Sequence, residues 1–100
     1  MIFDFHPEAG DEFREAVDWY EGRSIFAGGR FVKAVKGAIE QIMQDPERYQ
    51  TFGDGTHVFR LKTFPYRFYY TYEAEPDLIR IFAVMHEKRR PDYWRERLGN

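Results

Sequence analysis

The sequence predicts an α+β domain in which an N-terminal helical hairpin packs on a small, mostly antiparallel sheet. Two observations carry this prediction. Apolar residues recur at helical spacing through residues 8–44, and short alternating or fully apolar runs, typical of strands, follow in residues 58–85. The expected element order is β-α-α-β-β-β-α. With 100 residues the chain has room for one domain, residues 1–100, with a single modest core.

The N-terminal segment predicts an edge strand followed by a helix. Ile2-Phe3-Asp4-Phe5 is a short apolar stretch, and the residue before Pro7 favours extended backbone, so we expect the strand to end near His6. Pro7 suits the first turn of a helix, and Gly22 supplies its end. The predicted buried stripe of this helix consists of Ala9, Phe13, Ala16, Val17 and Tyr20.

A second helix is predicted from about Gly29 to Gln44, after a connection from Ser24 to Gly29. So short a connection makes the two helices antiparallel neighbours. A glycine inside a helix costs about 1 kcal/mol relative to alanine, so we expect Gly37 to mark close packing against the first helix. The apolar stripe consists of Phe31, Val35, Ala38, Ile39 and Ile42.

Three strands are predicted in the C-terminal half, at Val58–Thr63, Arg67–Glu73 and Leu78–Met85. In the middle strand the aromatic residues at 68, 70 and 72 should point to one face and residues 67, 69 and 71 to the other. The last strand is apolar on both faces apart from Arg80, as a central strand covered on both sides would be. A last short helix is expected from Pro91 to about Leu98.

Composition narrows the classes of function. The net charge is −2, with a balance of −4 in residues 1–50 and +2 in residues 51–100, which gives little support to general nucleic-acid binding. There is no cysteine for disulfide or thiolate chemistry, and the three histidines have no metal-ligand spacing. No cofactor fingerprint, membrane span or signal peptide is recognised, so we expect a cytoplasmic protein that needs no cofactor.

Basic side chains recur on the predicted strands, and a histidine stands where the last strand stops. We therefore expect any working surface to lie on the stretch from Val58 to Trp94. The alternative is that the strand cations form a solvated face and that His86 caps the strand end. Tyr93 and Trp94 are better explained as anchors of the last helix on the sheet than as substrate contacts.

Four pieces of sequence, in order along nearly the whole chain, together match one family of proteins. They are His6-Pro7-Glu8-Ala9 with Glu12-Phe13 and Glu15-Ala16-Val17-Asp18-Trp19-Tyr20; Arg30-Phe31 with Ala38-Ile39 and Asp45-Pro46; Arg60 with Phe64-Pro65-Tyr66-Arg67 and Tyr69-Tyr70; and Ala83-Val84-Met85-His86 with Arg89, Pro91 and Tyr93-Trp94. In these pieces the chain resembles the RelE/ParE superfamily, the toxins of bacterial type II toxin–antitoxin (plasmid-stabilisation) modules.

The resemblance implies one fold with different activities. RelE-like members are ribosome-dependent, metal-independent endoribonucleases (mRNA interferases), whereas ParE-like members are not enzymes and inhibit DNA gyrase. Because Arg67 and His86 coincide with site positions of RelE-like members, we expect the endoribonuclease, and gyrase inhibition is the alternative. A third alternative is a degenerate member that retains only antitoxin binding. In each case the resemblance implies a cognate antitoxin as partner, with operator DNA contacted through the antitoxin.

Under the RelE-like alternative, the resemblance assigns site residues. Three would be catalytic: Arg67 on the phosphate, His86 as proton donor, and Tyr93, which stacks on a base or orients the reacting groups. Three would bind substrate: Arg60, Lys62 and Arg89. Glu87 departs from the pattern, because the best-known RelE members are strongly basic directly after the last strand.

Overall fold

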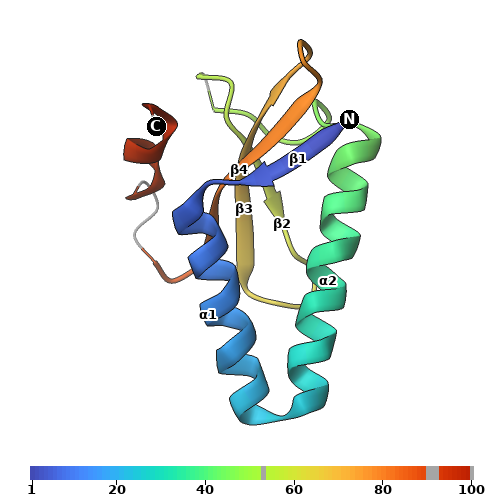
Figure 1. Cartoon of the computed structure of the whole chain (residues 1–100), viewed down its shortest axis with the longest axis vertical. Coiled ribbons are helices and arrows are strands. Elements are labelled where there is room, and N and C mark those ends of the chain that lie inside the picture. The colour runs from blue at the N-terminus through green and yellow to red at the C-terminus, as the bar shows by residue number, and fades with distance from the viewer. Residues whose placement is uncertain (53, 90–92, 100) are drawn as a thin grey trace.

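The computed structural model describes residues 1–52, 54–89 and 93–99. Two helices form a hairpin beside a sheet, and the C-terminal segment lies beside the sheet, near the first turns of α1 (Figure 1). The elements are β1 (Ile2–Phe5), α1 (Pro7–Arg23), α2 (Ile25–Gln44), β2 (His57–Arg60), β3 (Tyr66–Glu73), β4 (Leu78–His86) and the 3₁₀ helix η1 (Tyr93–Gly99). The predicted α+β architecture is confirmed.

The sheet is mixed, with the strand order β1-β4-β3-β2. β1 pairs in parallel with β4 over Ile2–Phe5, while the β2–β3 and β3–β4 pairs are antiparallel. Near the turn between β2 and β3, Arg67 lies opposite both Arg60 and Met85, and Tyr66 lies opposite His86. Since β1 stops at Phe5, it covers less than half of the β4 edge.

A single residue, Ser24, reverses the chain between the two helices. Its backbone N–H donates to the carbonyl of Tyr20, which ends α1, and its Oγ accepts from the N–H of Ala27 at 3.0 Å, which begins α2. The prediction of a connection from Ser24 to Gly29 was therefore wrong. One serine with extended backbone satisfies both helix ends, so α2 begins at Ile25.

The close contact between the helices lies at Gly28, and the prediction for Gly37 was wrong. A Cβ atom at Gly28 would stand 2.3 Å from Cγ of Glu21, whereas one at Gly37 would meet nothing within 4 Å. Gly28 lies about one turn after the reversal at Ser24. At this point α1 and α2 are still close together, so Gly28 lies against Glu21 of α1. Gly37 instead faces a shallow groove lined by Phe59 and Leu61.

Several element ends also differ from the prediction. β2 stops at Arg60 and not at Thr63, because the N–H of Leu61 donates to the carbonyl of Tyr66 and closes the turn. β4 continues to His86. The C-terminal segment forms 3₁₀ helix from Tyr93 to Gly99, and the expected helix start at Pro91 lies outside the described residues.

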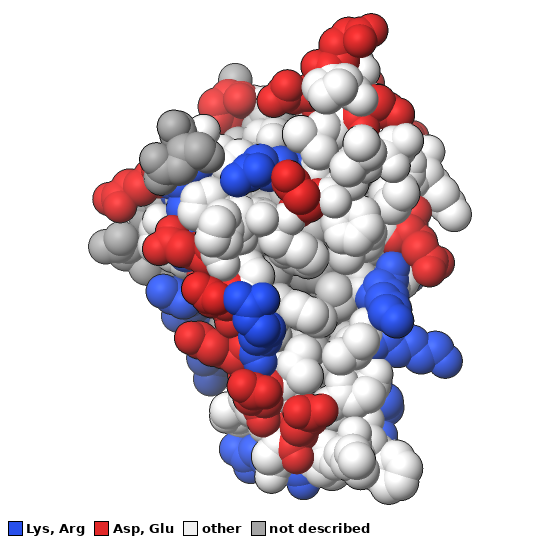
Figure 2. Space-filling model, in the orientation of Figure 1, with Lys and Arg blue, Asp and Glu red and all other residues white. Residues whose placement is uncertain are grey.

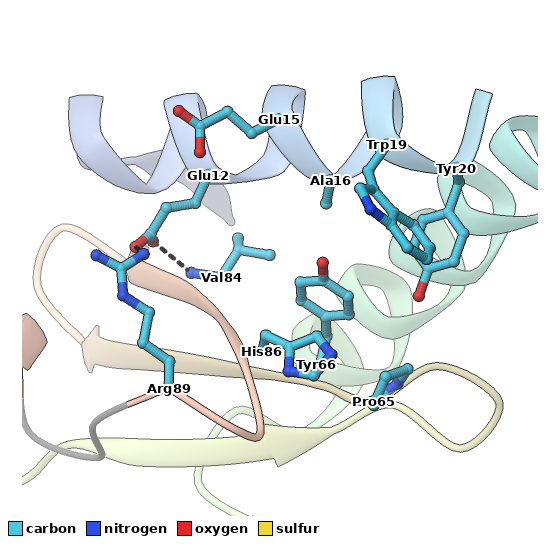
Figure 3. A pocket seen from close by; sticks show the side chains of 10 residues that line it. All are labelled: Glu12, Glu15, Ala16, Trp19, Tyr20, Pro65, Tyr66, Val84, His86 and Arg89. Carbon is cyan, nitrogen blue, oxygen red and sulfur yellow. Dashed lines mark hydrogen bonds and ion pairs between the residues drawn. The ribbon is translucent and has the colours of Figure 1, made fainter. Parts of the chain in front are cut away.

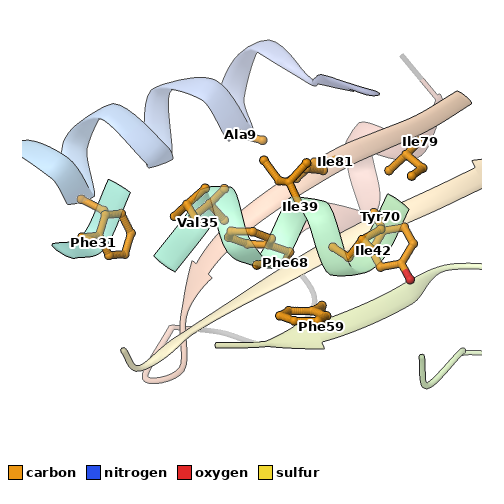
Figure 4. Packing of buried hydrophobic residues seen from close by; sticks show 13 residues of the cluster. Ala9, Phe31, Val35, Ile39, Ile42, Phe59, Phe68, Tyr70, Ile79 and Ile81 are labelled. Carbon is orange, nitrogen blue, oxygen red and sulfur yellow. The ribbon is translucent and has the colours of Figure 1, made fainter. Parts of the chain in front are cut away.

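The sheet carries apolar packing on both faces. The larger cluster lies between the hairpin and the sheet and includes Phe31, Ile42, Phe68, Tyr70 and Ile81 (Figure 4). The smaller cluster lies on the other face and consists of Val58, Tyr69, Ala83, Met85 and Trp94. The expectation that β4 is covered on both sides is confirmed, and η1 supplies the second cover through Trp94.

Phe31 is the central side chain of the hairpin, and replacing it tests this packing. It is fully buried and packs against the rings of Phe13, Tyr20, Phe64 and Tyr66. Phe31→Ala should lower the free energy of unfolding by about 3 to 5 kcal/mol, because the cavity adds to the lost burial. Urea titration measures the change. Ile2→Ala, at a side chain 62% exposed, is the control and should cost about 0.5 kcal/mol or less; equal costs would contradict the assignment.

Candidate functional site

A pocket of about 420 Å³ lies between α1 and the end of the β3–β4 hairpin (Figure 3). Glu12 and Arg89 stand at one end of it, while Trp19 and Tyr20 stand at the other. The lining combines small apolar, aromatic and charged side chains, namely Glu12, Glu15, Ala16, Trp19, Tyr20, Pro65, Tyr66, Val84, His86 and Arg89. Burial raises the pKa of the Tyr66 phenol, with a further contribution from Tyr20, so Tyr66 stays protonated at neutral pH.

Glu12 is the buried acid of this region. Its carboxylate accepts hydrogen bonds from the backbone N–H of Val84 at 3.0 Å, from the Arg97 guanidinium at 2.9 and 3.1 Å, and from the Tyr93 hydroxyl. The Arg89 guanidinium lies 3.5 Å away on the solvent side. The side chains of Glu12 and Arg97 are 9% and 8% exposed, so this is a buried ion pair.

The Glu12–Arg97 pair occupies the place of a missing strand. The last backbone contact on the β1 side of β4 is the His6 N–H, which donates to the carbonyl of Ile81. Beyond it, the Phe82 carbonyl accepts from Arg97 at 2.8 Å and the Val84 N–H donates to Glu12. A buried backbone polar group without a partner is costly, and the pair supplies both partners.

Arg97 is held on several sides at once. Its Nε lies 3.1 Å from the Glu8 carboxylate, in addition to its contacts with Glu12 and Phe82. Burial alone would lower the pKa of the Arg97 guanidinium, but the hydrogen bond and negative charge of Glu12 outweigh burial and raise it. Arg97 therefore carries a permanent positive charge inside the protein.

His86 lies at the pocket, on the helix side of the sheet. It faces Tyr66 across the β3–β4 pair, and the two rings contact edge to face at 5.2 Å between centroids. Its Nδ1 accepts from the backbone N–H of Lys88 at 3.1 Å. The histidine thus terminates β4 through a local hydrogen bond and turns the rest of its ring toward the pocket.

Arg60 and Arg67 lie on the other face of the sheet. Tyr66 and Phe68 pack toward the helices, and successive strand residues alternate in direction, so Arg67 projects away from the helices. Arg60 is its direct partner across β2 and donates to Gln50 at 3.2 Å. Among the described residues, the buried Nε of Arg67 has no hydrogen-bond partner.

Lys62 is separated from Arg60 by the end of β2. It stands in the bend after the strand and lines the groove beside Gly37 and Gln41 of α2. The strand predicted over Val58–Thr63 would have put Lys62 on the same face as Arg60. That prediction was wrong for Lys62, because β2 ends at Arg60 and the alternation of strand residues stops there.

Tyr93 and Arg89 belong to the Glu12 cluster. The Tyr93 ring lies under two guanidinium groups, those of Arg89 at 4.1 Å and Arg97 at 4.8 Å from its centroid. Burial, the hydrogen bond to Glu12 and the charge of Glu12 raise the pKa of the Tyr93 phenol. The adjacent Trp94 is buried and stacks on Tyr69, which anchors η1 to the sheet.

The structure thus divides the six predicted site residues among separate places. Arg60 and Arg67 share the face away from the helices, and His86 and Arg89 line the pocket on the other side. Tyr93 joins Arg89 through Glu12, and Lys62 stands by itself near α2. The sequence analysis did not predict that Glu12 and Arg97 make the most polar contacts in this region.

The described residues contain no group of three histidine, cysteine, aspartate or glutamate side chains placed to hold a metal ion. None of the described helices is long and apolar enough to cross a membrane.

Comparison with protein families gives one match. A family model described as the ParE toxin of the type II toxin-antitoxin system, parDE, matches residues 3–91. No curated protein matches the chain closely enough to serve as a relative.

The buried pair predicts a large effect of a small substitution. Glu12→Gln removes the buried counter-charge of Arg97 and leaves it only the exposed Glu8 carboxylate, so it should lower the free energy of unfolding by about 3 to 5 kcal/mol. Glu40→Gln, at an exposed position of α2, is the matched control and should change it by about 0.5 kcal/mol or less. Chemical denaturation of both variants checks this, and a Glu12 effect no larger than the Glu40 effect would contradict the ion-pair assignment.

The raised pKa of Tyr93 predicts a loss of stability in alkali. The folded protein holds this phenolic proton more tightly than the unfolded chain, whose tyrosines titrate near pH 10. The free energy of unfolding should therefore fall as the pH rises above about 10. In Tyr93→Phe this fall should be shallower, as measured by urea titration from neutral to alkaline pH. An unchanged slope would rule out this contribution from Tyr93.

Proposed function

Because the chain belongs to the ParE toxin family of type II toxin–antitoxin systems, we propose that it acts by binding DNA gyrase and not by cutting messenger RNA. The family implies a cognate antitoxin as partner. The antitoxin would neutralise the toxin in the cytoplasm and would carry the complex to operator DNA.

The observation that carries this proposal is the separation of Arg67 from His86 by the sheet. Cleavage of RNA by its own 2′-hydroxyl needs a proton acceptor, a proton donor and a stabilised phosphate within reach of one another. Tyr66 and His86 face the helices, and Arg67, the next residue along β3, faces the other way. Because the two side chains start from opposite faces of the sheet, this arrangement does not favour contact of both with one scissile phosphate.

The state of Tyr93 supports the same conclusion. Its hydroxyl donates to the Glu12 carboxylate, and its raised pKa keeps the phenol protonated. A protonated phenol that already donates to a carboxylate takes no proton from a 2′-hydroxyl. The ring also lies beneath Arg89 and Arg97, so the surface that would stack on a base is occupied.

Two assays on the purified protein separate the activities. DNA supercoiling by gyrase should be inhibited, and messenger RNA in a translating extract should stay intact. Arg67→Ala should keep its fold, because the Arg67 side chain contributes to no described ion pair. The variant should therefore inhibit gyrase as the wild type does. Cleavage of messenger RNA that disappears in both Arg67→Ala and His86→Gln would overturn the proposal in favour of the endoribonuclease. Activity in neither assay would favour a degenerate member that only binds its antitoxin.

A further inference from the structure

Two features in and beside the helical hairpin are open to a partner. The first is its tip, where Ile25 and Phe26 are 76% and 75% exposed, the most exposed large apolar side chains of the described residues. The second is the 420 Å³ pocket, whose outer wall is Trp19. Exposed apolar residues next to one another mark an interaction surface more often than isolated ones do.

The tip and one end of the pocket are both apolar. Away from the end where Glu12 and Arg89 stand, the pocket is lined by Ala16, Pro65 and aromatic rings, which suits an apolar side chain (Figure 3). The tip presents two such side chains at the reversal made by Ser24. Because both are largely exposed, they are not covered by the described residues of their own chain.

The charges around the two features are also complementary. α1 carries six acidic residues and two basic ones, and acidic side chains run along it in Figure 2. Glu15 on the pocket rim and the neighbouring Asp18 have no ion-pair partner among the described residues. α2 carries three basic residues, Arg30, Lys33 and Lys36, and one acidic residue, and Arg30 follows the tip by one turn.

The positions of the two features fit a closed pair of molecules. Trp19 stands on the last turns of α1, and Ile25 and Phe26 follow directly after the reversal. The tip and the Trp19 end of the pocket therefore lie at the same end of the hairpin. A two-fold dimer uses the same surface on both subunits, with each tip placed against the partner's pocket. In such a dimer the apolar tip of each chain is covered and the pocket of each chain is filled.

We propose that the toxin forms a two-fold homodimer in which the Ile25-Phe26 tip of each chain inserts into the Trp19 pocket of the other. Arg30 of one chain lies against Glu15 and Asp18 of its partner. The dimer covers the apolar tip while the protein is free of its antitoxin. Its existence does not depend on gyrase being the target.

The first test is the mass in solution, measured by sedimentation equilibrium over a range of concentrations. The wild type should associate to twice the chain mass of 12.1 kDa. Phe26→Asp at the tip and Trp19→Glu at the pocket should each weaken association at least tenfold. Both positions are exposed, so circular dichroism should show an unchanged fold. Ile2→Asp, an equally exposed apolar position on β1, is the control and should dimerise as the wild type does.

Mixing the variants gives the sharper test. The Trp19→Glu chain keeps a normal tip and the Phe26→Asp chain keeps a normal pocket, so an equimolar mixture should recover dimers that neither variant forms alone. Likewise Glu15→Lys and Arg30→Glu should each weaken the dimer, and the double variant should recover it. Fluorescence follows the same event, since Trp19 is 54% exposed and Trp94 is buried: the emission of Trp19 should shift to shorter wavelength on association.

Three results would overturn the proposal. The first is a monomer at every concentration. The second is a dimer that survives Phe26→Asp. The third is a mixture of Phe26→Asp and Trp19→Glu that stays monomeric.

Discussion

The buried ion pair between Glu12 and Arg97 is the constraint on which the rest of the structure depends. β1 covers the edge of β4 as far as the Ile81 carbonyl. Beyond that point no strand of the described residues pairs with this edge, and without other partners the Phe82 carbonyl and the Val84 N–H would face the interior unpaired. The Arg97 guanidinium donates to the Phe82 carbonyl, and the Glu12 carboxylate accepts from the Val84 N–H. The pair also bonds within itself, so each charge is compensated where it is buried.

This arrangement joins three elements that are distant in sequence. Glu12 belongs to α1, Arg97 to η1, and the backbone groups they satisfy belong to β4. With Arg97 fixed, Trp94 stacks on Tyr69 and covers the face of the sheet opposite the helices. The same network fixes Tyr93, whose hydroxyl serves Glu12. A tyrosine that the family resemblance assigns to catalysis thus contributes to structure in this chain, which accords with a toxin that works by binding.

The sequence predicted the architecture well because the apolar patterns are regular. The stripes of both helices and the alternation of Phe68, Tyr69 and Tyr70 correspond to the two packed faces of the sheet. Element ends were predicted wrongly where one residue makes a connection that was expected to need several, as Ser24 does between the helices. The early end of β2 was missed because Leu61 bonds back across the turn, which no periodicity reveals.

The candidate site was harder to predict, for a physical reason. Alternation along a strand predicts the face to which each residue points. Whether Arg67 and His86 lie on the same face depends in addition on the pairing register of β3 and β4, which alternation does not give. Glu12 did give a signal, because it lies three residues after Ala9 and four before Ala16, on the buried stripe of α1. A charge at such a position needs a partner. Nothing in the C-terminal sequence singled out Arg97 over its neighbouring arginines.

A double-mutant cycle on Glu12 and Arg97 tests the central claim most directly. Glu12→Gln and Arg97→Met are made singly and together, and the free energy of unfolding of each is measured in urea. If the two charges depend on one another, the double variant should lose less stability than the sum of the single losses, by about 1 to 3 kcal/mol. Additive losses would show that the two residues act independently and would contradict the account.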